Sequence, residues 1–178
     1  MLSLHKLQQQ LEHQQAPFDS WDPPFCGDMA LRIDQQGQWW YQDSPIGRLS
    51  LVKLFASVLV FEGKEYFLKT PVEKVRIQVE DVPFLIHSWH WQQTSAGPAL
   101  IAVTNLNEQV LIGQQHPICL QDYQAQPVPY IALWRDLQAR LCRTVYYQWI
   151  EEAQQQPQPN PNQLWLQSTD YSFLLGQL

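Results

Sequence analysis

Alternation of apolar and polar residues predicts most strands of this chain, and the stretch near its middle shows it most clearly. In Lys74–Glu80 every second residue is valine or isoleucine, and the residues between them are charged or polar. Pro71 and Pro83 stand on either side of this run, where the chain is expected to turn. Thr70–Phe84 is therefore predicted to be a turn, a strand and a second turn, with charge on one face.

The sequence before this stretch predicts an N-terminal helix, an irregular arm and a first α+β unit. Leucines at helical spacing favour a helix over Ser3–Gln15 that lies on a partner surface, and the proline-rich residues 16–27 favour an extended arm. A helix is predicted from Pro45, with Ser44 as its N-cap, to about Phe61. The strands predicted in this half are Ala30–Asp34, Trp39–Gln42, Tyr66–Lys69 and Lys74–Glu80.

The sequence after it predicts a second unit of similar order. A long helix is expected from about Tyr130 to Gln155, because its leucines, Val145 and Trp149 recur at helical spacing. The strands predicted in this half are Phe84–Gln92, Ala99–Thr104, Gln109–Gly113, Leu164–Gln167 and Ser172–Leu175.

Both halves thus read as hairpin, helix, hairpin, which predicts an internal duplication within an α+β fold. The pair Pro45-Ile46 also matches Pro117-Ile118 at the offset that aligns the first hairpins. The alternative is that an α+β chain shows such an order by chance. The predicted organisation is an N-terminal helix and arm (1–24), a first subdomain (25–83) and a second subdomain (84–178).

Composition limits the classes of function. The chain has 178 residues, 45% of them hydrophobic, and a net charge of −6, which disfavours a nucleic-acid polymer as partner. Three cysteines without C-x-x-C spacing fit a reducing compartment. The polar N-terminus and the short apolar runs predict neither a signal peptide nor a membrane span. We therefore expect a cytoplasmic protein, and the sequence leaves its oligomeric state open.

Several short motifs occur in an order that resembles a known bacterial family. They are Cys26-Gly27-Asp28, Ser44-Pro45-Ile46-Gly47-Arg48, Leu51–Phe55, Thr70–Val75, Val79–Phe84, Thr104-Asn105, His116-Pro117 and Pro129-Tyr130. Residues 25–178 resemble the family known as domain of unknown function 1285. The resemblance implies a duplicated α+β core, a C-terminal half loosely like pleckstrin-homology folds, and a ligand site between the halves for a nucleotide-like molecule in signalling. Residues Trp165–Asp170 lack the glycine pair that this family usually has there.

Basic residues are few, so their positions are informative. Arg48 and Lys53 lie near the start of the first predicted helix, and Arg135 and Arg140 lie on the second. If the halves pack by pseudo-symmetry, these residues converge with Lys74 at the junction, where guanidinium groups would bind a phosphate or carboxylate. The alternative is that they form structural ion pairs with nearby carboxylates. The predicted ligand-binding residues are Arg48, Lys53, Thr70, Glu73, Lys74, Asp81, His116, Arg135 and Arg140.

Other chemistry has weaker support. Asp28, Glu73 and Asp81 have no spacing that demands acid–base catalysis, and no His or Cys set has the spacing of a metal site. Cys26 is a thiol without a visible base. We expect no cofactor and no metal.

Three functions remain open from the sequence. The first is a regulatory module that binds a small anionic, nucleotide-like molecule at the junction of the two repeats. The second is a protein-interaction adaptor that uses exposed aromatics or the N-terminal helix. The third, an enzyme of unrecognised type, is disfavoured because no catalytic motif is present.

Overall fold

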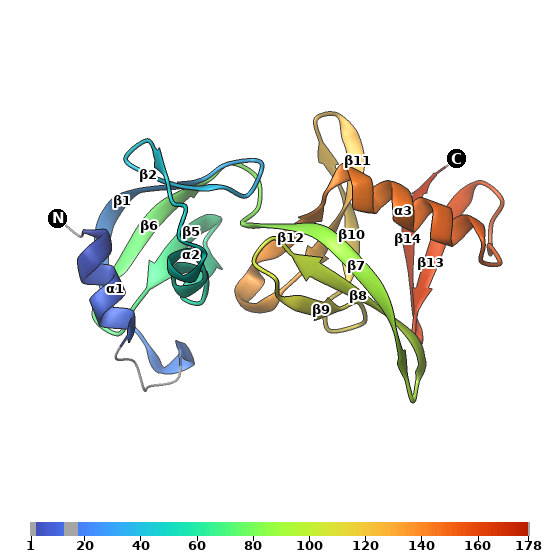
Figure 1. Cartoon of the computed structure of the whole chain (residues 1–178), viewed down its shortest axis with the longest axis horizontal. Coiled ribbons are helices and arrows are strands. Elements are labelled where there is room, and N and C mark those ends of the chain that lie inside the picture. Colours follow the sequence, from blue (N-terminus) through green and yellow to red (C-terminus); the bar gives the residue numbers. More distant parts are fainter. Residues whose placement is uncertain (1–2, 13–17, 178) are drawn as a thin grey trace. The chain divides into compact units, whose positions relative to one another are not determined.

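A computed structural model describes residues 3–12 and 18–177, which form two units that meet in the sequence between Asp81 and Val82 (Figure 1). The structure confirms a mixed α+β fold with two similar six-stranded sheets.

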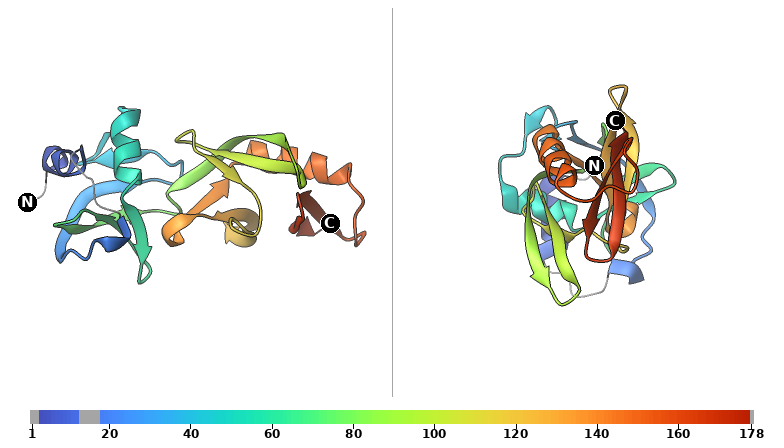
Figure 2. Two further views of the ribbon diagram at one scale, coloured as in Figure 1. Left: turned by 90° about the horizontal axis from the view of Figure 1, so that it is seen from below. Right: turned by 90° about the vertical axis from the view of Figure 1, so that its right-hand side faces the viewer.

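The first unit holds one of these sheets with short helices before and between its strands. Its elements are α1 (Leu4–Glu12), η1 (Phe18–Ser20), β1 (Phe25–Ile33), β2 (Trp39–Tyr41), β3 (Ser44–Pro45), α2 (Leu49–Ala56), β4 (Leu59–Glu62), β5 (Glu65–Lys69) and β6 (Lys74–Val79). The sheet order is β3-β2-β1-β6-β5-β4, and β1 and β6 are parallel. α2 lies on one face of the sheet, where Phe55 packs against Trp39 with ring centroids 6.4 Å apart (Figure 2).

The N-terminal helix belongs to the core of the first unit. The prediction of Ser3–Gln15 is confirmed as α1 up to Glu12, and residues 13–15 of it lie outside the described residues, as do residues 16–17 of the predicted arm. Leu7 and Leu11 of α1 are buried. The leucine stripe is therefore covered within its own unit. It cannot serve as the exposed apolar surface that an adaptor using the N-terminal helix would need.

The second unit repeats the sheet and adds a helix and a hairpin. Its elements are β7 (Phe84–Thr94), β8 (Gly97–Thr104), β9 (Gln109–Leu111), β10 (Ile118–Tyr123), β11 (Gln126–Ala132), η2 (Trp134–Asp136), β12 (Gln138–Leu141), α3 (Arg143–Gln154), β13 (Gln163–Ser168) and β14 (Tyr171–Gln177). The sheet order is β10-β11-β12-β7-β8-β9, with β7 and β12 parallel. Trp149 of α3 is fully buried against Phe173 of β14, with ring centroids 5.8 Å apart.

The duplication is therefore real, but the repeating unit is not the predicted hairpin–helix–hairpin. In each unit the first three strands and the last three strands of the sheet form antiparallel meanders, and the first and sixth strands pair in parallel. Pro45 lies in β3 and Ile118 in β10, so the matched Pro-Ile pairs occupy different strands of the two sheets. α2 stands between the two meanders of the first unit, whereas α3 follows both meanders of the second.

The predicted helix from Pro45 to Phe61 was wrong at both ends. Ser44 and Pro45 form the edge strand β3, and α2 begins only after Arg48, which is its N-cap residue. Leu59 and Val60 of β4 are both buried, as expected for strand residues covered on both faces. Gly63, at φ +58°, turns β4 into β5 instead of ending a helix.

The predicted helix from Tyr130 to Gln155 was also wrong in its first half. Leu133, Leu137 and Leu141 are buried as expected, but they lie before η2, directly after it and in β12. Only Val145 and Trp149 of the predicted stripe are on α3. Arg135 and Asp136 have positive φ values of 54° and 58°, which a continuous α-helix does not allow.

Candidate functional site

Basic residues of the first unit are engaged in ion pairs on its sheet. Arg76 donates from Nε to Asp28 Oδ1 at 2.7 Å and from Nη1 to Glu65 Oε1 at 2.8 Å. The hydrogen bond from Arg76 lowers the pKa of Asp28 below its usual value. Arg32 pairs with Glu80 at 2.9 Å in the same way. These side chains lie at the surface, where ion pairs contribute little to stability.

Three of the predicted ligand-binding residues, Thr70, Glu73 and Lys74, also have local partners in this unit. Lys74 pairs with Glu62, and Glu73 accepts hydrogen bonds from Lys6 at 3.0 Å and from Gln10 at 3.3 Å. Thr70 is fully buried, and its Oγ1 accepts from the backbone N–H groups of residues 72 and 73, which fixes the turn before β6. Burial, and secondarily the charge of Asp81, raises the pKa of Tyr66 to about 12.

Arg48 and Lys53 differ from these residues. Both side chains are exposed, Arg48 at the N-cap of α2 and Lys53 within it, and neither has an ion-pair partner among the described residues. Their convergence with residues of the second unit stays a prediction.

The three predicted residues of the second unit come from different elements. His116 is half-buried, with Nδ1 3.0 Å from the carbonyl oxygen of Ala132. Arg135 lies in η2. Arg140 lies on β12, where it is only 8% exposed and lines a pocket.

This pocket, which we call the Arg–Tyr pocket, lies between the tip of the β10–β11 hairpin and the N-terminal turn of α3. It has a volume of about 640 Å³. Its lining residues are Tyr123, Gln124, Gln126, Pro127, Val128, Arg140, Leu141, Arg143, Tyr146 and Tyr147. Two guanidinium groups and three phenol rings thus share one pocket, and none of the lining residues is acidic.

Both arginines of the pocket contact tyrosines. The guanidinium carbon of Arg140 lies 3.7 Å from the centre of the Tyr123 ring, which is a close cation–π contact. Arg143 donates from Nε and Nη2 to the hydroxyl of Tyr147 at 3.2 and 3.1 Å. Within residues 3–12 and 18–177 Arg143 forms no ion pair, so its charge is not neutralised by a carboxylate.

Tyr146 fixes the wall of the pocket that α3 contributes. Its hydroxyl donates to the carbonyl oxygen of Leu175 on β14 at 2.7 Å, and its ring stacks beside Tyr147 with centroids 6.4 Å apart. Burial raises the pKa of Tyr146, so this phenol stays neutral over an even wider pH range than usual. The hydrogen bond to β14 and the helix together hold this wall in place.

Of the residues that line this candidate pocket, the sequence prediction included Arg140 but not Arg143 or the three tyrosines. The wrong helix placed Arg140 and Arg143 on one element, and residues before Tyr130 were assigned to a loop. The available signal was the i, i+4 spacing of Arg143 and Tyr147, which brings the two side chains together on a helix.

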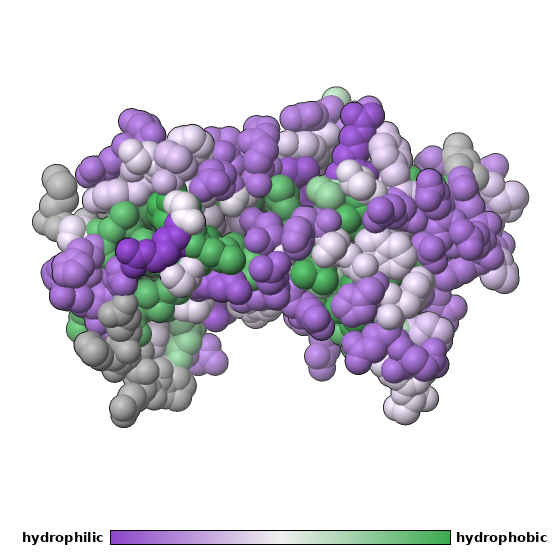
Figure 3. All heavy atoms as spheres, in the orientation of Figure 1, coloured by the Kyte–Doolittle hydropathy of each residue, from purple (hydrophilic) through white to green (hydrophobic). Residues whose placement is uncertain are grey.

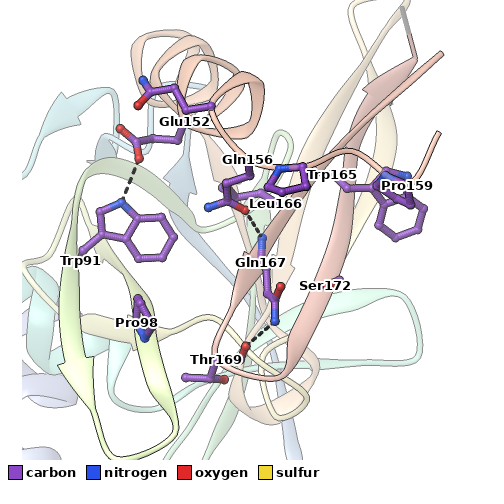
Figure 4. Close-up of a pocket in the computed structure, with 12 residues that line it drawn as sticks. Trp91, Pro98, Glu152, Gln156, Pro159, Trp165, Leu166, Gln167, Thr169 and Ser172 are labelled. Carbon is purple, nitrogen blue, oxygen red and sulfur yellow. Dashed lines mark hydrogen bonds between the residues drawn. The ribbon is translucent and has the colours of Figure 1, made fainter. Parts of the chain in front are cut away.

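A second recess of the same unit lies at the other end of α3, and we call it the Trp–Gln cleft (Figure 4). Its volume is about 700 Å³. Its lining residues are Trp91, Pro98, Glu152, Gln155, Gln156, Pro157, Pro159, Trp165, Leu166, Gln167, Thr169 and Ser172. No lysine or arginine is among them. The outward side of α3 between the two recesses is mostly hydrophilic (Figure 3).

Two further properties of the described residues bear on chemistry. They contain no group of three or more His, Cys, Asp or Glu side chains arranged to hold a metal ion. None of the helices among them is long and apolar enough to cross a membrane.

Comparison with known proteins gives family matches over nearly the whole chain. The model of the N-terminal domain of DUF1285, a domain of unknown function, matches residues 16–82, and that of its C-terminal domain matches residues 83–175. A comparison with curated proteins finds no match.

Two solved structures are similar to this chain. A DUF1285 family protein from Silicibacter pomeroyi DSS-3 is 29% identical, with a TM-score of 0.82 over 97% of this chain and 95% of the other. A DUF1285 family protein from Shewanella baltica OS155 is 32% identical, with a TM-score of 0.57 over 70% of this chain and 92% of the other.

Proposed function

Because the chain belongs to the DUF1285 family, whose function is unknown, we propose a function from its own residues: it binds a small anionic, nucleotide-like molecule and acts as a regulatory module. The observation that carries this proposal is the pair of arginines, Arg140 and Arg143, that share the Arg–Tyr pocket with three tyrosines and no carboxylate.

The charge of the pocket favours an anion. Arg140 is almost fully buried, so its interaction with a phosphate or carboxylate is less screened by water than that of a surface arginine. A guanidinium group forms two parallel hydrogen bonds with either anion. Arg143 adds a second cation at the mouth, where its side chain is exposed.

The shape and the aromatic lining favour a flat group attached to that anion. Ligand pockets commonly measure 300–1,000 Å³, and about 640 Å³ suffices for a mononucleotide. The rings of Tyr123 and Tyr147 provide faces on which a base can stack. The proposal thus keeps the ligand class expected from the sequence and gives it a pocket within the second unit.

The finer predictions made from the sequence belong to the same proposal. Arg48 and Lys53 are exposed and without ion-pair partners among the described residues, so their charges are not neutralised by a carboxylate. The likeness of the second unit to pleckstrin-homology folds and a role in signalling stay predictions.

A thermal-shift screen tests the proposal. Nucleoside mono-, di- and triphosphates, cyclic nucleotides and pyrophosphate are tested against the wild type, Arg140→Met, Arg143→Gln and the control Arg76→Gln. A ligand present at about 100 times its Kd stabilises the folded state by about 2.7 kcal/mol, which raises Tm by several degrees. We expect this shift in the wild type and in Arg76→Gln, and little of it in the two pocket variants.

Two outcomes would overturn the proposal. One is that no anionic ligand stabilises the wild type. The other is that Arg143→Gln, an exposed substitution that leaves the core untouched, keeps the full shift.

A further inference from the structure

We propose that the Trp–Gln cleft is a second binding site and that it takes a neutral polyhydroxylated ligand, a mono- or short oligosaccharide. The cleft lies in the second unit between the β7–β8 hairpin and the β13–β14 hairpin, with the C-terminal end of α3 beside it (Figure 4). It shares no lining residue with the Arg–Tyr pocket, so its ligand chemistry is argued separately.

The charge of the cleft disfavours the anion that the Arg–Tyr pocket favours. Glu152 is the single ionisable residue among the lining residues, and its carboxylate is half-buried. A phosphate placed here would face this negative charge with no cation from the lining residues to offset it. The cleft therefore favours a ligand without negative charge.

Trp91 provides an apolar face in a fixed orientation. Its Nε1 donates to Glu152 Oε2 at 3.0 Å, and its ring contacts Trp89 edge to face, at 6.0 Å between centroids. With these two contacts set, the six-membered ring of Trp91 extends toward the middle of the cleft (Figure 4). A rigid indole of this kind packs well against the C–H face of a pyranose ring, because its π face is negative and the C–H groups are weakly positive.

Side-chain amides provide donors and acceptors around this ring. Gln156 Oε1 accepts from the backbone N–H of Gln167 at 3.3 Å, and Gln167 Nε2 donates to the carbonyl oxygen of Thr169 at 2.8 Å. These bonds orient both side chains. Among the described residues the amide NH₂ of Gln156, the amide oxygen of Gln167 and the hydroxyl of Ser172 have no protein partner.

This combination matches the chemistry of sugars. Each hydroxyl of a saccharide both donates and accepts, so neighbouring hydroxyls can use an amide NH₂, an amide oxygen and a carboxylate oxygen at the same time. Such a site needs a few oriented polar groups and an aromatic face within a recess of ligand size, and the cleft has all of these at about 700 Å³. A proline-rich peptide would use the tryptophans, but its proline residues have no N–H to donate to the amide oxygen of Gln167 or to the carboxylate of Glu152.

Titration of the full-length protein with neutral saccharides, followed by ¹H–¹⁵N NMR of the tryptophan indole N–H groups, tests the proposal. The probes are glucose, galactose, mannose, N-acetylglucosamine, maltose and cellobiose, with a proline-rich peptide and choline as competing ligands of other classes. We expect saturable shifts of the Trp91 and Trp165 indole signals with at least one saccharide.

Matched variants separate binding from stability. Trp89 and Trp91 both hydrogen-bond to α3, Trp89 through Gln148 at 2.7 Å, but only Trp91 lines the cleft. Trp91→Ala is expected to weaken saccharide binding about tenfold, whereas the control Gln148→Ala, an exposed substitution outside the cleft, should leave it within about twofold. Gln167→Ala, at an exposed position, is expected to weaken binding several-fold even if Trp91→Ala fails to fold.

Three results would overturn the proposal. They are the absence of any shift with all six saccharides, equal affinity in Gln167→Ala and the wild type, and saturable binding of the peptide or choline instead of a saccharide.

Discussion

The basic residues of the two units have different surroundings, although the two sheets have the same strand order. In the first unit Arg76, Arg32 and Lys74 pair with carboxylates on their own sheet. In the second unit Arg140 lies over Tyr123, and Arg143 bonds to Tyr147. A carboxylate neutralises a cation, whereas the Tyr147 hydroxyl orients Arg143 and leaves its charge for an anion from solution.

The comparison also indicates which part of a duplicated fold carries the candidate sites. Both recesses of the second unit use α3, the Arg–Tyr pocket at its N-terminal turn and the Trp–Gln cleft at its C-terminal end. Among the described residues of the first unit, α2 is the only α-helix that connects strands of the sheet, and it lies between the two meanders. The helix added after the repeated sheet thus contributes to both sites, together with residues of the sheet itself.

Among the substitutions that test this comparison, those in the hydrophobic cores of the two units should have the largest effect on stability. Trp39 and Trp149 are both buried, each packed on a phenylalanine of its own unit. Trp149→Ala should cost about 3–5 kcal/mol of unfolding free energy, because it removes a large buried side chain and leaves a cavity. Trp149→Ala should speed up amide hydrogen exchange in residues 82–177, and Trp39→Ala should speed it up in residues 18–81. Equal acceleration in both ranges for either variant would show that the two cores are not separate.

An intermediate effect is expected at the turn before β6. Thr70 is fully buried and its hydroxyl accepts from two backbone N–H groups, at 3.3 and 3.1 Å. Thr70→Val keeps the shape but leaves these donors unpaired, which should cost about 1–3 kcal/mol in urea unfolding. Thr70→Ser retains the hydroxyl and serves as control. If valine and serine destabilise equally, the hydroxyl is not what holds this turn.

The smallest effect is expected from the surface ion pair of the first unit. The pKa of Asp28 is lowered by Arg76, so the pair stabilises the fold above the unfolded-state pKa and this contribution is lost as pH falls through the lower, folded-state pKa. Arg76→Gln should therefore lower Tm slightly at neutral pH and not at all in strong acid or high salt. A Tm difference that persists at acidic pH would mean that Arg76 acts through packing instead of charge.

Much of the fold could be predicted from the sequence because alternation is a local signal. The strands around Thr70–Phe84 and the final hairpin agree with the structure within a few residues. The long helices were wrong because leucines at 133, 137 and 141 have helical spacing but occupy successive short elements. Only the tertiary pairing of β11, β12 and β7 decides between these arrangements.

The candidate site was less predictable. Arg140 was among the predicted residues because basic residues are scarce, but its partner Tyr123 comes from a hairpin that the sequence presents as a proline-containing loop. The turn of this hairpin uses Gln124 and Ala125 with φ of 52° and 62°, residues that carry no turn signal.

Thr70–Phe84 keeps its predicted strand, and two of its charged residues, Glu73 and Lys74, have partners within the first unit.

The most direct test of the central claim is ¹⁵N NMR of the arginine Nε–H groups during titration with a nucleoside triphosphate. The account predicts saturable shifts for Arg140 and Arg143, and unchanged signals for Arg32 and Arg76, whose charges are paired with carboxylates. Shifts at Arg32 and Arg76 with none at Arg140 and Arg143, or no saturable shift at any arginine, would contradict it.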